Sequence, residues 1–322
     1  MSDSPAPRPL FVFDILPDGT AQAAAGVFAP VVAGGYRWMH FDLGDPGLDG
    51  WAEAALPRLA ARTLLAPKTR PRVDSDDDGA LVIALRGINL NAGAEEADMV
   101  SLRMWVTETL VVTVRRDRVL AVEEIRAQVD TGDAPPSPAR LVARIVEGLV
   151  DRIEAVADEL EDIADDLEDD VYENGRTPLR ALSPLRRKVI KLRRHVAPLS
   201  DALQDLGQVK TPLIKGAMKN RLRESANRCT RALEELAEVH DRLGAMADHL
   251  DMAQAARLEN NGYRLSVAAA IFLPLGIITG LFGVNVGGMP GVDHPHAFWW
   301  LTASMVVLAV AVYVIFRLRR WF

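Results

Sequence analysis

Two long uncharged runs near the C-terminus constrain this chain of 322 residues more than any other feature. Residues 265–284 and 297–316 contain no Asp, Glu, Lys or Arg. At about 1.5 Å per residue, a helix of either run covers the roughly 30 Å of a bilayer core. The alternative, a buried core helix of a soluble protein, rarely comes as two such runs in succession. We therefore expect two transmembrane helices, 265–284 and 297–316, joined by a loop at 285–296.

The charges beside these runs predict how the chain is oriented. Arg257 and Arg264 precede the first run, a basic tail at 317–322 follows the second, and the loop has no Lys or Arg. By the positive-inside rule both termini are cytoplasmic and the loop faces outward. The N-terminal segment lacks the basic start and apolar centre of a signal peptide. We expect a multi-pass protein of the cell inner (plasma) membrane, in contact with the lipid bilayer.

Residues 1–136 predict an α/β cytoplasmic domain. Helical spacing is seen at 51–65 and 119–129, and five other segments are rich in β-branched, aromatic and aliphatic residues. Alternation of this kind indicates one mixed sheet with helices packed on it. The expected strands are 10–16, 36–43, 80–90, 100–106 and 109–114.

After the break TGDAPPSP the chain becomes helical. Residues 137–210 predict a hairpin of two helices, the first acidic at 158–170 and the second basic at 186–194, which should be joined by ion pairs. Residues 211–264 predict a stalk helix that continues into the first membrane run, about 110 Å long at about 1.5 Å per residue. Self-association would bury its heptad seam, so we expect a homo-oligomer. The seam is Leu222, Ala226, Cys229, Leu233, Leu236, His240, Leu243, Ala247 and Leu250.

The small and polar residues of the first membrane run follow the same spacing of fours and threes. They include Ser266, Ala269, Leu273, Gly276 and Gly280. Small residues at this spacing allow close helix packing, which is one interpretation. The other is that this stripe lines a pore shared by several chains, with Leu273 as an apolar gate.

The end of this run also resembles a known family. IFLPLGIITGLFGVN, residues 271–285, resembles the end of the first membrane helix in the CorA-type metal transporters, which carry a Gly-x-Asn tripeptide. Gly283, Val284 and Asn285 occupy that place. Val284 and the glycines that follow, together with residues 64–91 and 98–116, resemble the ZntB zinc-transporter branch. The resemblance implies a funnel-shaped CorA-like homopentamer in which stalk helices line the pore and the second span lies outside.

The resemblance also implies candidates for ion selection at the outward mouth: Gly283, Val284 and Asn285. A ring of Asn285 amide oxygens would accept hydrogen bonds from the water around a hydrated divalent cation. The ordinary alternative for Asn285 is a helix C-cap. The cation would be the transported substrate, no cofactor would be permanently bound, and uptake of zinc would be coupled to protons.

Four further residues are candidate metal ligands. Asp293, His294 and His296 lie in the outward loop, and His240 lies on the stalk seam. Imidazole and carboxylate suit zinc. The alternatives are a polar loop without a metal role and a packed or solvated stalk histidine.

These observations favour one function and leave two alternatives. The preferred function is transport of divalent cations, zinc foremost, and the alternatives are a magnesium, cobalt or nickel channel of the same family and a membrane-anchored scaffold or sensor. No enzyme is expected, because phosphate-binding loops and nucleophile settings are missing from the sequence. A net charge of −7 argues against nucleic acid as a partner, and a single cysteine, Cys229, excludes an intrachain disulfide.

Overall fold

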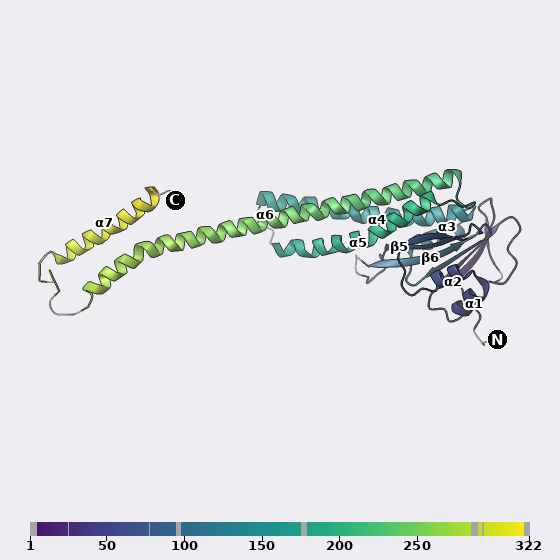
Figure 1. Cartoon of the computed structure of the whole chain (residues 1–322), viewed down its shortest axis with the longest axis horizontal. Helices are drawn as coiled ribbons and strands as arrows, with labels where there is room; N and C mark the ends of the chain where they lie inside the picture. The colour runs from purple at the N-terminus through teal and green to yellow at the C-terminus, as the bar shows by residue number, and fades with distance from the viewer. Residues whose placement is uncertain are drawn as a thin grey trace. The chain divides into compact units, whose positions relative to one another are not determined.

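The computed structural model describes residues 5–24, 26–76, 78–94, 98–174, 179–284, 289–291 and 293–318 (Figure 1). The chain divides into two units, Met1–Ala247 and Asp248–Phe322. Each unit is described by itself below.

The first unit contains a seven-stranded mixed sheet in the order β2-β1-β3-β7-β6-β5-β4. Only β3 and β7 pair in parallel; the other neighbours are antiparallel. This confirms the mixed sheet and the five expected strands. The two strands that were not predicted, β2 and β4, are the short edge strands. The strands are β1 Phe11–Ile15, β2 Ala21–Ala23, β3 Tyr36–Asp42, β4 Arg72–Ser75, β5 Leu81–Ile88, β6 Met99–Val106 and β7 Leu110–Arg115.

Helices cover both faces of the sheet (Figure 1). One face carries α1 (Leu48–Ala55) and α2 (Arg58–Leu64), and the other carries α3 (Leu120–Asp130), α4 (Pro138–Asp169) and α5 (Leu179–Gln208). The single helix predicted at 51–65 is wrong, because it is broken before Pro57, which cannot supply the amide donor that a helix interior needs. The core against α1 and α2 includes Trp51, Leu64 and Trp105.

The first long helix, α4, begins as the sequence indicates. Ser137 caps α4, its Oγ accepting from the amide of Arg140 at 3.3 Å, and Pro138 follows at the first helical position. A π-helical turn, Asp170–Asn174, ends α4. The third helix, α6, runs from Gly216 to Phe282, so it starts five residues later than predicted.

Most of the predicted seam on α6 is buried within one chain. Leu222, Cys229, Leu236 and Leu243 are at most 1% exposed, because α4 and α5 lie beside this part of α6 (Figure 1). The expectation that the seam needs another copy of the chain for its burial is therefore wrong for these positions. His240 is only half-buried, as is Leu233.

The acidic run of α4 pairs with α6. The prediction was pairing with the basic helix α5, yet the ion pairs of this run among the described residues join Asp165 and Glu168 to Arg242 of α6. Lys191 of α5 contacts Asp98 at 2.7 Å. The bonded partners are 74 residues apart at each step, so α4 and α6 run parallel in register. The pairs are Arg221–Glu147 at 3.1 Å, Arg228–Glu154 at 3.0 Å and Arg242–Glu168 at 2.8 Å.

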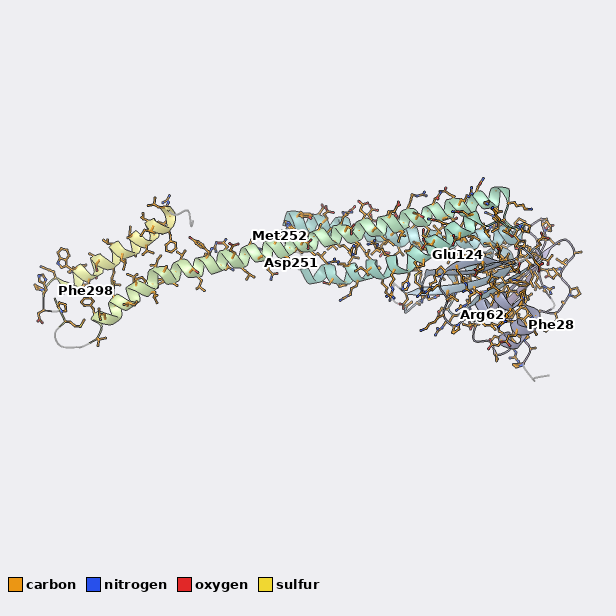
Figure 2. The ribbon with its side chains drawn as sticks, viewed as in Figure 1. Phe28, Arg62, Glu124, Asp251, Met252 and Phe298 are labelled. Atoms are coloured by element: carbon orange, nitrogen blue, oxygen red, sulfur yellow. The ribbon has the colours of Figure 1, made fainter. Side chains whose placement is uncertain are left out.

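The second unit consists of the rest of α6 and of α7, Ala297–Leu318. Both helices include a segment that is long and apolar enough to cross a membrane, and neither segment is buried inside the chain. Figure 2 shows Met252 and Phe298 on these helices; their side chains are 72% and 70% exposed. Apolar surface on this scale requires cover by lipid or protein.

Candidate functional site

The predicted stripe lies on the side of α6 that faces away from α7. Within the second unit the half-buried residues of α6 include Val267, Ile271, Leu275 and Ile278, which recur at helical spacing on one face. Ile278 lines a groove together with Ala297 and Leu301 of α7, so this face is toward α7. The half-buried residues of α7 form a matching face. All five stripe residues are exposed, and at 100° per residue they lie about half a turn from the α7 face. The stripe is Ser266, Ala269, Leu273, Gly276 and Gly280.

No contact among the described residues explains the glycines of this stripe. A Cβ atom placed on Gly276 or Gly280 would meet no other atom within 4 Å. The only hydroxyl of the stripe, on Ser266, donates to the carbonyl of Gly262 at 2.9 Å, so it is satisfied inside the helix. Small side chains here leave room for something outside one chain, either a second copy or a path for an ion.

Leu273 is the bulkiest stripe residue and is 69% exposed. The next residue, Pro274, lies inside α6 and donates no backbone hydrogen bond. A bulky apolar side chain beside a proline fits the predicted gate position.

The candidate residues for ion selection lie where α6 ends. The amide of Gly283 donates to the carbonyl of Thr279 at 2.8 Å and to that of Gly280 at 3.2 Å, which closes the last turn. Val284 is 53% exposed. Asn285, the third member, lies outside the described residues. Two of the three are therefore placed at the helix terminus.

The loop histidines are neighbours. Their ring centroids are 5.9 Å apart, and Nδ1 of His294 accepts from the amide of His296 at 3.2 Å. That bond occupies one ring nitrogen of His294. Asp293 is exposed beside them, and in the described part of the chain no three His, Cys, Asp or Glu side chains gather as a metal site. One chain's loop therefore does not supply a three-ligand site by itself.

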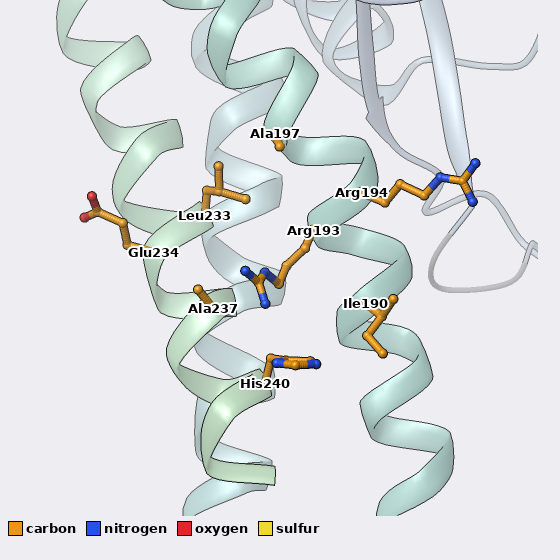
Figure 3. A pocket seen from close by; sticks show the side chains of 8 residues that line it. All are labelled: Ile190, Arg193, Arg194, Ala197, Leu233, Glu234, Ala237 and His240. Atoms are coloured by element: carbon orange, nitrogen blue, oxygen red, sulfur yellow. The ribbon is translucent and has the colours of Figure 1, made fainter. Parts of the chain in front are cut away.

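His240 lies in a different unit, in a groove of about 600 Å³ between α5 and α6. Its Nδ1 is 2.9 Å from a carboxylate oxygen of Asp241. Arg193 extends from α5 into the same groove (Figure 3). A guanidinium in the same groove opposes binding of a divalent cation at His240.

One polar feature was not predicted from the sequence. A cleft at the β4 edge of the sheet gathers four arginines from three separate segments of the chain. No spacing rule could indicate it, because its residues are brought together only by strand pairing and by the position of α5.

Comparison with known proteins agrees with this architecture. The profile of the family described as CorA-like Mg²⁺ transporter protein matches residues 33–320. The zinc transport protein ZntB of Pectobacterium carotovorum is 32% identical over 286 residues, which cover 88% of this chain and 87% of that protein. The divalent cation transporter CmaX of Pseudomonas aeruginosa is 33% identical over 288 residues, with the same coverage of both chains. Among solved structures, full-length CmaX superposes with a TM-score of 0.86 at 29% identity, covering 99% of this chain and 100% of that one.

These matches span the α/β domain, the long helices and both apolar C-terminal helices. The family match reaches across most of the chain, and the identity to relatives exceeds 30% over most of their length. The chain belongs to the CorA-like Mg²⁺ transporter family, on its ZntB branch.

Proposed function

We propose that this protein moves divalent cations across the inner membrane, zinc foremost, through a pore on the axis of a homo-oligomer. The observation that carries the proposal is the stripe of small residues on α6, which is exposed on the face opposite α7. A face of this kind, with glycines whose surroundings are open, suits a pore wall better than a lipid-facing surface.

Two membrane helices cannot enclose a water path, so transport requires several copies of the chain. The number five and the funnel shape come from the family resemblance. In this arrangement residues 1–136 are the cytoplasmic domain, 137–210 the helical hairpin and 211–264 the stalk. Residues 265–284 line the pore, 285–296 form the outward loop, 297–316 lie outside the pore helix, and 317–322 return to the cytoplasm.

In this proposal the pore holds the cation through weak contacts with several copies of the same residue. A ring of Asn285 amides would hold a hydrated cation through its water shell, without the tight binding that would stall it. Carbonyl groups near Gly283 would extend that ring. Leu273 would close the path by excluding water when the helices approach. The protein then needs neither catalysis nor a resident cofactor.

Zinc is preferred to magnesium because of the relatives on this branch. ZntB proteins are named for zinc transport, whereas the family as a whole is named for Mg²⁺. Val284 at the middle of the Gly-x-Asn tripeptide follows the zinc branch. Proton coupling is part of the same proposal, and nucleic acid is not a partner.

Flux measurements test the proposal. The full-length protein, reconstituted in liposomes, should carry Zn²⁺ faster than Mg²⁺, and a pH gradient should change the zinc rate. Magnesium moving faster would assign the protein to the magnesium, cobalt or nickel alternative. If neither metal moved faster than through empty liposomes, the transporter proposal would fail and the scaffold alternative would stand.

A substitution at the mouth tests the site. Asn285→Leu should reduce zinc flux at least tenfold and leave the oligomer intact, because the amide oxygens are lost without any change in the helices. The matched control is Thr302→Val, which removes a hydroxyl that donates to the carbonyl of Phe298 within α7. Unchanged flux in the Asn285 variant would remove this residue from the ion path.

A further inference from the structure

A polar cleft of about 720 Å³ lies in the first unit, between the β4 edge of the sheet and α5. Its volume falls in the roughly 300–1,000 Å³ range of small-molecule sites. Four arginines line it, contributed by the segment before β4, by β4, by β5 and by α5: Arg70, Arg72, Arg86 and Arg194. Transport as proposed above uses none of them.

Most of this positive charge has no carboxylate partner. Arg72 is 3.2 Å from a carboxylate oxygen of Asp74. Arg86 is half-buried and donates to the carbonyl of Thr69 at 2.6 Å, a neutral acceptor. For Arg70 and Arg194 no ion pair occurs within the described ranges of the chain. Three guanidinium groups therefore remain available to an anion.

His195 adds a neutral donor to the same wall. Its Nδ1 lies 3.4 Å from Nη1 of Arg86, a contact in which only the imidazole can accept. Burial lowers the pKa of His195, and the charges of Arg86, Arg194 and Lys191 lower it further. The ring is therefore neutral near pH 7, and its second nitrogen is free to donate to a ligand.

A further arginine without a carboxylate partner, Arg103, lies on the same face of the sheet as Arg86. Arg103 is completely buried and donates to the carbonyl of Ala66 at 2.7 Å and to the hydroxyl of Ser101 at 3.1 Å, with no ion pair in the part of the chain that the structure describes. Ser101 is opposite Arg86 in the β5–β6 register, so Arg103, two residues further, lies on the same face as Arg86.

Elsewhere the chain compensates a buried arginine directly. Arg37 is bonded to both carboxylate oxygens of Asp14, at 2.7 and 2.8 Å. Leaving Arg86 and Arg103 without such a partner creates a positive field at this edge of the sheet, and a field of this kind attracts anions.

The other end of the cleft is acidic. Asp201 and Asp205 line it from α5, one helical turn apart, and neither forms an ion pair among the described residues. They follow Arg194 by seven and eleven residues, or about 10 and 16 Å along the helix at about 1.5 Å per residue. The cleft thus presents cations at one end and hydrogen-bond acceptors at the other.

We propose that this cleft binds a nucleoside phosphate, with the phosphates at Arg70, Arg86, Arg194 and His195 and the nucleoside at Asp201 and Asp205. Guanidinium groups bind phosphate oxygens in pairs, which is the geometry that arginine favours. The two carboxylates accept hydrogen bonds from sugar hydroxyls or base amino groups. A metal ion would meet four arginines, and inorganic phosphate would leave the acidic end unused.

Calorimetric titration of the full-length protein in detergent tests this proposal. The buffer should contain EDTA and little salt, so that metal binding by the nucleotide does not contribute. ATP, ADP, AMP and inorganic pyrophosphate are titrated separately. We expect saturable binding of one nucleotide per chain, tighter with more phosphates, and weaker binding of pyrophosphate than of ATP.

Neighbouring arginines provide a matched pair of variants. Arg194→Gln should weaken ATP binding at least tenfold. Arg193→Gln should leave it within twofold, because Arg193 extends toward α6 whereas Arg194 points to the other side of α5 (Figure 3). Thermal unfolding of both variants checks that they fold alike. Should Arg194→Gln fail to fold, Arg70→Gln, at an exposed position, replaces it.

A second variant tests the acidic end. Replacing both Asp201 and Asp205 by Asn should weaken ATP binding severalfold and leave pyrophosphate binding unchanged. The proposal is overturned if no nucleotide binds saturably, or if the Arg194 and Arg193 variants bind ATP equally. Pyrophosphate binding as tightly as ATP would refute the nucleoside part.

Discussion

Glu235 of α6 faces Glu161 of α4. The two residues are 74 positions apart, the same offset that separates Arg228 from its bonded partner Glu154. Position 235 carries a carboxylate, whereas the neighbouring positions at this offset carry the guanidinium groups of Arg228 and Arg242. Burial and the charges of Asp158 and Glu161 raise the pKa of Glu235 above its ordinary value. Three carboxylates meet here, and the charge of Arg231 offsets their repulsion only in part, so this position weakens the α4–α6 pair.

Replacing this carboxylate should therefore stabilise the protein. Glu235→Arg would place a guanidinium opposite Glu161 and should raise the free energy of unfolding by about 0.5–1 kcal/mol, the scale of an exposed ion pair. Glu235→Gln should gain less. The thermal midpoint of the detergent-solubilised protein at pH 7.5 measures both, and Glu238→Gln, at an exposed position on the same helix, is the control.

The cost of the Glu235 carboxylate should depend on pH. A carboxyl with a raised pKa binds its proton more tightly in the folded state, so its cost is full at neutral pH and disappears as the pH falls through the folded pKa. The advantage of Glu235→Gln should therefore shrink on acidification toward pH 4. An advantage that grows there would contradict the assigned repulsion.

His40 should make the protein sensitive to acid. The ring is buried on β3; its Nδ1 is 2.8 Å from the hydroxyl of Thr113, which itself donates to the carbonyl of Met39. Nδ1 therefore carries the proton, and the buried Nε2 has no hydrogen-bond partner among the described residues. Burial and the charge of Arg115 lower the pKa of His40 to about 3.

Because the unfolded chain takes up this proton near pH 6.5 and the folded chain does not, stability falls as the pH drops from about 6.5 toward 3. One proton corresponds to a slope of about 1.4 kcal/mol per pH unit. Urea unfolding at pH 7 and pH 5 should show this loss, and His40→Phe should reduce it. A control variant, His240→Phe, should keep the wild-type dependence.

Gly280→Leu should block transport without unfolding the chain. A Cβ atom at Gly280 meets nothing within 4 Å among the described residues of one chain, so we expect any penalty to come from other copies or from the pore itself. We expect zinc flux to fall at least tenfold. The thermal midpoint should stay within about 2 °C, which corresponds to a change of less than about 1 kcal/mol in the free energy of unfolding for a protein of this size. Native mass spectrometry separates a blocked pore from a lost oligomer.

Val307→Leu, at a 68% exposed position of α7, is the control for Gly280→Leu and should leave flux unchanged. Equal flux in both variants would mean that the stripe faces lipid.

Cys229 should be unreactive in the folded protein. It is completely buried beside α4 and α5, and burial with the nearby charge of Glu154 raises the pKa of its thiol to about 12. Because the thiolate is the reactive form, thiol reagents at pH 8 should modify no cysteine before denaturation and one afterwards. Rapid modification of the native protein would show that the helices separate in solution.

The elements with strong local signals could be predicted from the amino-acid sequence alone. The uncharged runs at 265–284 and 297–316, the Ser137-Pro138 helix start and the alternating strands of the first domain need no tertiary information, because period and capping are local properties. The family could also be identified from sequence, through residues 271–285. The sequence showed that the stripe residues from Ser266 to Gly280 share one helix face, but it did not show what that face meets.

What each surface faces depends on the tertiary structure. The stripe lies opposite α7, most of the α6 seam is buried beside α4 and α5, and Glu168 in the acidic run of α4 pairs with Arg242 of α6, 74 residues away. The arginine cleft likewise forms from three separate segments of the chain. Spacing in one helix gives only the angles between side chains, so which face meets a neighbour, solvent or ligand depends on contacts between residues distant in the chain.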